Sequence, residues 1–192
     1  RARAMRVGST GVLLEESNHT SGRVCQDWAC SGRREMESED RALLKSLLEE
    51  QRLVALGLVV EGEPVIGLLP FAVSEDYGAL YVQASGLARH SRGLVAGARF
   101  SGVIHRPDAP EEDALRTPRA VLEGVVDPFD EDRPEKAVAV RSLVGRFPSA
   151  AMTLALPDFK VYRLELTGGR LIGGFGRALN LAVSHFEDLG RA

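Results

Sequence analysis

The sequence predicts a mainly β fold with flanking helices (α+β), whose core is an antiparallel sheet or a closed barrel. Short apolar runs rich in β-favouring residues recur between residues 53 and 172. Turn-forming residues separate these runs at nearly regular intervals. Patterns with helical spacing are few, and they lie at the joints between the runs. Short strands joined by short turns in this way are typical of antiparallel sheets and barrels.

The first predicted element is a helix that begins close to Met36. Ser38 can cap this helix, because its hydroxyl can accept a backbone N–H of the first turn. Glu39 and Asp40 follow in that turn, where the helix dipole favours negative charge. One apolar face is then marked by four leucines: Leu43, Leu44, Leu47 and Leu48.

Residues 1–37 differ from the rest of the chain. They are rich in Arg, Ser and Gly, and their apolar residues show no sustained period. We therefore predict an N-terminal extension over 1–37, either native or an artefact of upstream translation, and a core domain over 38–192. Cys25 and Cys30 lie in the extension; without a second Cys pair or a paired His they favour incidental thiols over a zinc site.

Each strand expected after the first helix is bounded by turn or loop residues. Glu61–Pro64 separates the first two strands, and Thr167–Gly169 separates the last two. The predicted strands are Leu53–Val60, Val65–Val73, Leu80–Ala84, Arg99–His105, Pro118–Val126, Lys160–Leu166 and Arg170–Ile172. Helical spacing between the fifth and sixth of them predicts a helix over Pro134–Arg146.

The charge balance excludes one broad class of function. The chain carries 24 Lys and Arg against 27 Asp and Glu, a net charge of −3. A general nucleic-acid binder needs a surplus of cations to displace counterions from phosphates, so we expect no nucleic-acid partner. No apolar run approaches the roughly 20 residues that span a bilayer, and no segment has the character of a secretory signal. We therefore expect a cytoplasmic protein with no membrane partner.

A strand-to-helix turn carries the first candidate site. Ser85 and Gly86 follow the third strand, and a short helix with Arg89, His90 and Ser91 comes next. Hydroxyls and an arginine beside the first turn of a helix are suited to binding a phosphate group. The alternative is a solvated basic helix face.

Two further segments are weaker candidates. Alternation along the fifth strand puts Arg119, Val121 and Glu123 on one face, so Arg119 either reaches a ligand at a barrel mouth or faces water. The glycine-rich segment from Gly173 to Ala178 contains Phe175 and Arg177, but it lacks the third glycine of a dinucleotide fingerprint.

The histidines suggest no catalytic motif. They are His19, His90, His105 and His185, and none belongs to an H-E-x-x-H or another recognised arrangement. No residue among the motifs is an obvious general acid or base. The catalytic residues are therefore left unassigned, and no metal site is predicted unless haem is bound.

Six segments together carry a resemblance to a known family. They are RLVALGLVVEGEPVIGLLPFAV, ASGLARHSRGL, TPRAVLEGVVDP, LVGRFPSA, DFKVYRLEL and IGGFGRA, in that order. In order and spacing they resemble the pyridoxamine 5′-phosphate oxidase-like split-barrel proteins, and most closely the branch of putative FMN-binding and haem-utilisation proteins. The resemblance spans residues 39–186.

The resemblance implies a six-stranded antiparallel split barrel that forms a homodimer, with FMN between the subunits and a small-molecule substrate. It implies that the turn from Ser85 to Ser91 meets the FMN phosphate and that Arg119 reaches the cofactor. The cofactor-binding residues that it implies are Leu69, Pro70, Phe71, Ser85, Arg89, His90, Ser91, Arg119, Phe175 and Arg177.

Three functions stay open at this point. The first is an FMN-dependent oxidoreductase of unknown substrate. The second is a haem-binding or haem-degrading protein, with His185 as the candidate iron ligand. The third is a non-catalytic dimeric binding module, which is favoured by Gly86 and Gly93 at positions where the related branch usually has polar side chains.

Overall fold

The computed structural model describes residues 36–111, 113–130 and 132–191. The predictions made for residues 1–35, including those for Cys25 and Cys30, lie outside this part of the chain. Met36 is 8% exposed and packs in the core, so the folded part includes this residue.

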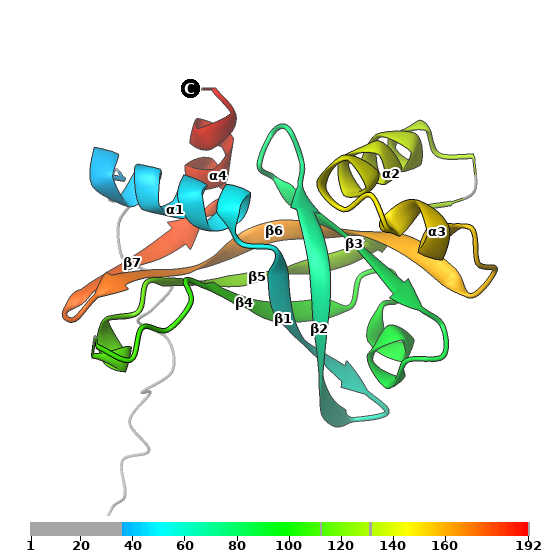
Figure 1. Cartoon of the computed structure of the whole chain (residues 1–192), viewed down its shortest axis with the longest axis horizontal. Coiled ribbons are helices and arrows are strands. Elements are labelled where there is room, and N and C mark those ends of the chain that lie inside the picture. The colour runs from blue at the N-terminus through cyan, green and yellow to red at the C-terminus, as the bar shows by residue number, and fades with distance from the viewer. Residues whose placement is uncertain (1–35, 112, 131, 192) are drawn as a thin grey trace, which may run out of the picture. The chain divides into compact units, whose positions relative to one another are not determined.

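Within the described residues, the sheet closes on itself as a barrel (Figure 1). The strand order is β3-β2-β1-β4-β5-β6-β7, and β3 also pairs with β6, which closes the six-stranded barrel and leaves β7 as an extension. All pairs are antiparallel. The strands are β1 Leu53–Val60, β2 Glu63–Val73, β3 Ala79–Ser85, β4 Arg99–His105, β5 Arg119–Pro128, β6 Phe159–Gly174 and β7 Arg177–Ala182. The predicted split-barrel fold is confirmed.

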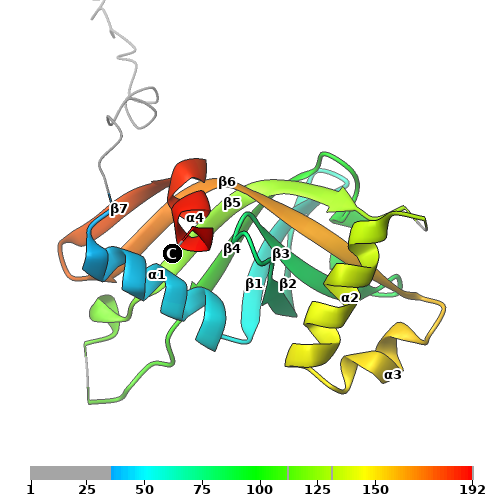
Figure 2. The ribbon, with the colours of Figure 1, turned by 90° about the horizontal axis from the view of Figure 1, so that it is seen from above.

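The helices gather at two sides of the barrel (Figure 2). α1 and α4 lie near each other at one side, and α2 and α3 lie at the other. The helices are α1 Ser38–Glu50, α2 Pro134–Arg146, α3 Ala150–Leu154 and α4 Val183–Gly190, with short 3₁₀ helices η2 Arg89–Gly93 and η3 Ala114–Arg116. No helix in the described ranges combines the length and the apolar character needed to cross a membrane.

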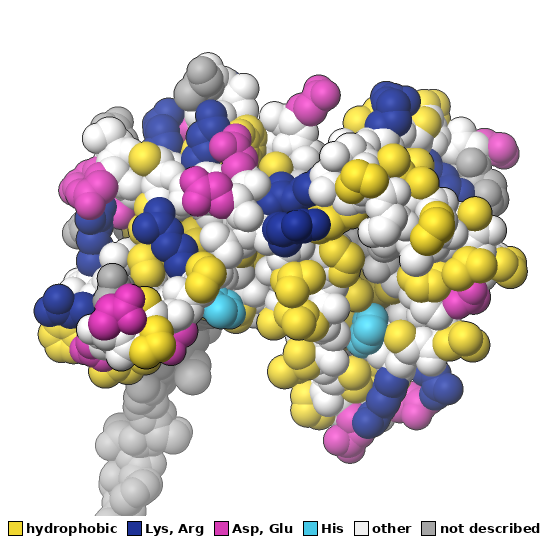
Figure 3. Space-filling model, in the orientation of Figure 1, with side chains coloured by type: hydrophobic (Ala, Val, Ile, Leu, Met, Phe, Trp, Pro, Cys, Tyr) yellow, Lys and Arg dark blue, Asp and Glu magenta, His cyan; other side chains and the backbone are white. Residues whose placement is uncertain are grey.

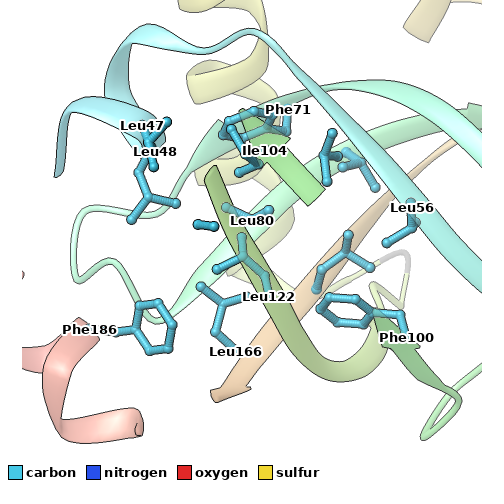
Figure 4. Packing of buried hydrophobic residues seen from close by; sticks show 14 of the residues in the cluster. Leu47, Leu48, Leu56, Phe71, Leu80, Phe100, Ile104, Leu122, Leu166 and Phe186 are labelled. Atoms are coloured by element: carbon cyan, nitrogen blue, oxygen red, sulfur yellow. The ribbon is translucent and has the colours of Figure 1, made fainter. Parts of the chain in front are cut away.

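The core fills the barrel and extends under α1 and α4. The strands alternate between inward apolar residues and outward residues, as β1 and β5 show most clearly. Figure 4 shows Phe71, Leu80, Ile104 and Leu122 among the packed side chains; each is fully buried. Ala120 and Leu122 point inward, which confirms the predicted alternation in which Arg119 shares the opposite face.

The C-terminal third differs from the prediction. Thr167–Gly169 is no turn, because β6 runs unbroken from Phe159 to Gly174. The glycines lie within this strand and allow it to approach its neighbour closely. Gly169 has φ +152°, and a side chain there would meet the Val121 carbonyl oxygen at 2.1 Å, so only glycine allows β5 to pair with β6 here.

Two other differences are local. α1 has Glu37 as its N-cap residue without a side-chain cap, so the prediction that Ser38 caps the helix is wrong; Ser38 is already helical. The elements α3, β7 and α4 were not predicted. They are short, and their sequences carry no sustained period.

Candidate ligand site on the outer face of the barrel

The outer face of three neighbouring strands is apolar and uncovered by any described element. Ile66 and Leu68 on β2 are 76% and 63% exposed, and Val59 and Leu53 on β1 are 64% and 48% exposed. Cross-strand pairing places Leu68 beside Ala55, and Ala55 beside Val103 of β4. We call this surface the open sheet face; it comprises Leu53, Ala55, Val59, Ile66, Leu68 and Val103. Figure 3 shows hydrophobic side chains gathered over β1 and β2 beside an indentation.

A pocket of about 390 Å³ lies at one end of the open sheet face. The pocket combines the apolar side chains of that face with polar ones, among them Arg52, His105 and the acidic Glu50. The residues that line it are Glu50, Gln51, Arg52, Leu53, Ala55, Leu68, Val103, His105 and Pro107. Apolar walls with a few polar groups are the usual composition of a ligand pocket.

His105 ends β4 and is exposed in this pocket. Its Nδ1 lies 2.7 Å from the carbonyl oxygen of Arg106. Because a carbonyl can only accept, Nδ1 carries the proton in this contact, and Nε2 of the neutral ring keeps its lone pair. The cross-strand partner of His105 is Arg119 on β5, so an arginine stands next to the imidazole on the same outer face.

A second arginine, Arg146, lies close enough to Arg52 for their charges to interact. The Arg146 guanidinium donates to the carbonyl oxygens of Leu48, Glu49 and Gln51 at the C-terminus of α1. Burial, followed by the charge of Arg52, lowers the pKa of Arg146. Arg146 is engaged by these carbonyls and does not line the pocket, so the charged side chains that line it are Arg52 and Glu50.

The predicted segment Leu69–Phe71 divides between inside and outside. Leu69 and Phe71 are buried in the core at 5% and 0% exposure, so their side chains do not reach the barrel exterior. Pro70 is half-buried and pairs with Leu53 of the open sheet face. Of the three, only Pro70 therefore offers a side chain next to the pocket.

The turn after β3 is held together by its own hydrogen bonds. Ser85 Oγ donates to Asp158 Oδ2 at 2.5 Å and accepts the Leu87 N–H. Ser91 Oγ donates to the Ser85 carbonyl at 2.6 Å, and the Gly86 N–H donates to the Asp158 carbonyl. The predicted phosphate contact at Ser85 and Ser91 stays a prediction, for which these hydroxyls would have to exchange partners.

The 3₁₀ helix η2 after this turn packs against β1 and β2. His90 lies so close to Gly67 that a Cβ atom at residue 67 would be 2.7 Å from its Cγ. Its Nε2 is buried without a hydrogen-bond partner in the described chain, and burial lowers the pKa of the ring. His90 therefore faces the barrel, whereas the neighbouring Arg89 is exposed and, within the described ranges, engaged by no hydrogen bond or ion pair.

The glycine-rich segment forms the turn between β6 and β7. Phe175 is 77% exposed at this turn. Arg177 forms ion pairs with Glu39 at 2.6 Å and with Asp40 at 2.7 Å, which join β7 to the first turn of α1. Hydrogen bonding and charge attraction to Arg177 lower the pKa of Glu39. The role visible for Arg177 is thus to hold α1.

His185 is buried at 5% exposure in α4. Its Nδ1 accepts a hydrogen bond from the Ala182 N–H at 3.1 Å, so the neutral ring carries its proton on Nε2. An imidazole in that form has no free lone pair for iron. Ligation by His185 stays a prediction, and this arrangement of the ring does not support it.

The described residues contain no group of three or more His, Cys, Asp or Glu side chains that could hold a metal ion. A protein-built metal centre is therefore not visible in this part of the chain. A haem iron is a different case, because the porphyrin supplies four nitrogen ligands and the protein needs to add only an axial one.

The closed barrel, its extra strand and the uncovered outer face define a protein of the split-barrel class. No protein-family model matches the chain. One solved structure is 32% identical, has a TM-score of 0.65, and matches over 80% of this chain and 98% of its own length. The chain belongs to the pyridoxamine 5′-phosphate oxidase-like split-barrel family.

Three named proteins show the range of this similarity. The haem oxygenase HutZ of Vibrio cholerae is 23% identical over 147 residues, which are 76% of this chain and 82% of HutZ. A haem-binding protein from Mycobacterium smegmatis has a TM-score of 0.69 at 23% identity, over 80% of this chain and 62% of its own. A protein of Clostridium acetobutylicum, described as related to general stress protein 26 and as of the pyridoxine phosphate oxidase family, has a TM-score of 0.59 at 13% identity, over 79% and 99%.

Proposed function

We propose that this protein is a homodimeric split barrel that binds haem on the open sheet face. The observation that carries the proposal is the pocket in which an apolar floor, the Arg52 guanidinium and a histidine with an available Nε2 meet. Haem has the matching chemistry, with a flat apolar ring, carboxylate groups and an iron that takes an axial ligand. The similarity to proteins named for haem binding and haem oxygenation supports this choice.

The exposed apolar surface supports the proposal of a second subunit. Ile66, Leu68 and Val59 are each more than 60% exposed, and neighbouring strands make them one continuous patch. Patches of this kind mark interaction sites. A second copy of the chain that covers this patch would supply the wall opposite the pocket, because a flat ring needs apolar contact on both faces.

Titration of the purified protein with haemin tests this function. We expect a shifted Soret band that saturates as haemin is added. Light scattering gives the mass of the protein in solution, from which the number of haemin molecules bound per dimer is calculated. Residues that hold the group act by binding and orienting it; the haem itself supplies the iron chemistry. If haemin gave only the broad spectrum of the free compound at every protein concentration, the haem proposal would be wrong.

FMN is the second candidate, and the exposed Arg89 favours it. An arginine without a described partner at the turn after β3 can bind a phosphate group in a forked geometry. Quenching of FMN fluorescence tests this, with Arg89→Ala as the variant and the exposed Arg99→Ala as its control. Saturable quenching that only Arg89→Ala weakens supports flavin binding and an FMN-dependent oxidoreductase. If the protein bound neither compound, a non-catalytic dimeric module would remain.

A further inference from the structure

We propose that His105 is the axial ligand through which this chain binds haem iron. The inference rests on the proposed function and assigns a residue that the sequence motifs leave without a role. It starts from the tautomer of the ring. The Arg106 carbonyl, 2.7 Å from Nδ1, holds the proton on that nitrogen and leaves the Nε2 lone pair for a metal. A backbone carbonyl on the other ring nitrogen is the usual support of a metal-binding histidine.

The surroundings of His105 match the rest of a haem. The imidazole lines the same pocket as Leu53, Leu68 and Val103, which offer apolar contact to a ring. Arg52 lines this pocket as well, and Arg119 is the cross-strand neighbour of His105. Arg52 lies between α1 and β1, and Arg119 lies on β5, where its guanidinium also donates to the Thr117 carbonyl oxygen. Guanidinium groups are suited to carboxylates, which matches a ligand with charged groups at its edge.

The other described histidines lack this arrangement. His185 uses Nδ1 as an acceptor inside α4, so its Nε2 holds the proton. His90 has its Nε2 buried against the barrel, where an iron with four porphyrin nitrogens has no room. His105 is thus the described histidine that combines exposure, a supported tautomer and a pocket.

Spectroscopy of haemin-loaded protein tests the assignment. Wild type, His105→Ala and His185→Ala are titrated with haemin, and the reduced complexes are examined by resonance Raman for an iron–histidine stretch. We expect wild type and His185→Ala to show this stretch. We expect His105→Ala to lose it and to bind haemin at least about tenfold more weakly, which corresponds to about 1.4 kcal/mol.

Rescue separates ligation from a structural effect. His105→Gly leaves space at the end of β4, so added imidazole should restore the stretch and the Soret position in that variant but change nothing in wild type. Circular dichroism and the melting temperature of each variant show whether the substitution leaves the fold intact.

The outcomes distinguish this inference from the proposed function. If wild type binds no haemin, both are wrong. If wild type binds haemin with an iron–histidine stretch that survives in His105→Ala, or with no such stretch, haem binding stands and the assignment of His105 is overturned. If the iron–histidine stretch disappeared only in His185→Ala, the iron ligand would be His185 of α4.

Discussion

The guanidinium of Arg146 lies 5.1 Å from the centre of the fully buried Phe71 ring. The same group donates to backbone carbonyls at the end of α1, so one side chain of α2 joins a core ring of β2 to the C-terminus of another helix. A cation at this end of a helix is stabilised by the helix dipole as well as by the hydrogen bonds.

Replacement of Arg146 should therefore destabilise the fold. We expect Arg146→Ala to lower the free energy of unfolding by about 2–4 kcal/mol, because carbonyl groups near the core lose a charged donor. Urea denaturation measures this, with the exposed Arg141→Ala on the same helix as control, for which we expect a change within about 0.5 kcal/mol. Equal denaturation midpoints for the two variants would contradict this role.

Gly67 is predicted to be a packing position for His90. In Gly67→Ala the new methyl group would lie 2.7 Å from His90 Cγ, so η2 has to move outward. We expect a loss of about 1–3 kcal/mol in the free energy of unfolding and faster amide exchange over residues 89–93. Gly145→Ala is the control: no atom lies within 4 Å of its added Cβ, and alanine in the helix α2 should be neutral or stabilising. If amide exchange over residues 89–93 were unchanged in Gly67→Ala, the close contact between Gly67 and His90 would be refuted.

The lowered pKa of His90 predicts a dependence of stability on pH. Burial favours the neutral ring, so the pKa of His90 is lower in the folded chain than the ordinary histidine value of 6.5. Below pH 6.5 the unfolded chain binds more protons at this residue, and stability falls as the pH falls. We expect His90→Gln to reduce the loss of melting temperature between pH 7 and pH 5 relative to wild type. His105→Gln is the control. If it reduced the loss of melting temperature as much as His90→Gln does, His90 would not be the cause of the pH dependence.

The proposed homodimer, with the open sheet face as its interface, predicts which substitutions would yield monomers. Ile66→Asp puts a charge on a side chain that is 76% exposed in one subunit, so it should leave the monomer folded and abolish the dimer. Sedimentation velocity measures this. Met152→Asp, at 75% exposure on α3 away from the face, is the matched control and should remain dimeric. A dimer that survives Ile66→Asp together with Leu68→Asp would place the interface elsewhere.

Arg177 offers a test of a residue that sequence resemblance assigned to the cofactor. In Arg177→Ala the buried Asp40 loses its ion pair with β7, and Glu39 loses the interaction that lowers its pKa. We expect a lower melting temperature and unchanged affinity for haemin and FMN. Weaker binding of either compound without loss of stability would restore Arg177 to the ligand site.

The strands were predictable because apolar residues alternate with other residues along them, and the apolar residues are those that point into the barrel. The ranges Leu53–Val60 and Arg99–His105 agree with the structure, as does the helix Pro134–Arg146. Thr167–Gly169 was misread because glycine pairs are typical of turns. Here they allow β6 to pass close to the backbone of β5, a requirement set by a strand that is distant in sequence.

The pocket could not be predicted for a similar reason. Its residues come from the end of α1, from β1, β2 and β4, and from the segments just before β1 and just after β4. Only the strand register brings Leu68, Ala55 and Val103 into one row. His105 belongs to no motif in the sequence. The signal that could have indicated its role was its position at the end of an alternating strand, on the same outward face as Val103.

Because pleating separates the two faces of each strand, ligand preference and folding can evolve independently in this barrel. Along β1, β2 and β4, the inward residues fill the barrel, whereas the outward residues lie on the other face of the sheet, where only Ala72 of the described residues in these strands is buried, beside α2. Substitution of every second residue on these strands can therefore change the outer surface and leave the barrel interior as it is. A designer who wants a new ligand can likewise restrict a library to the outward positions and leave the barrel interior unchanged.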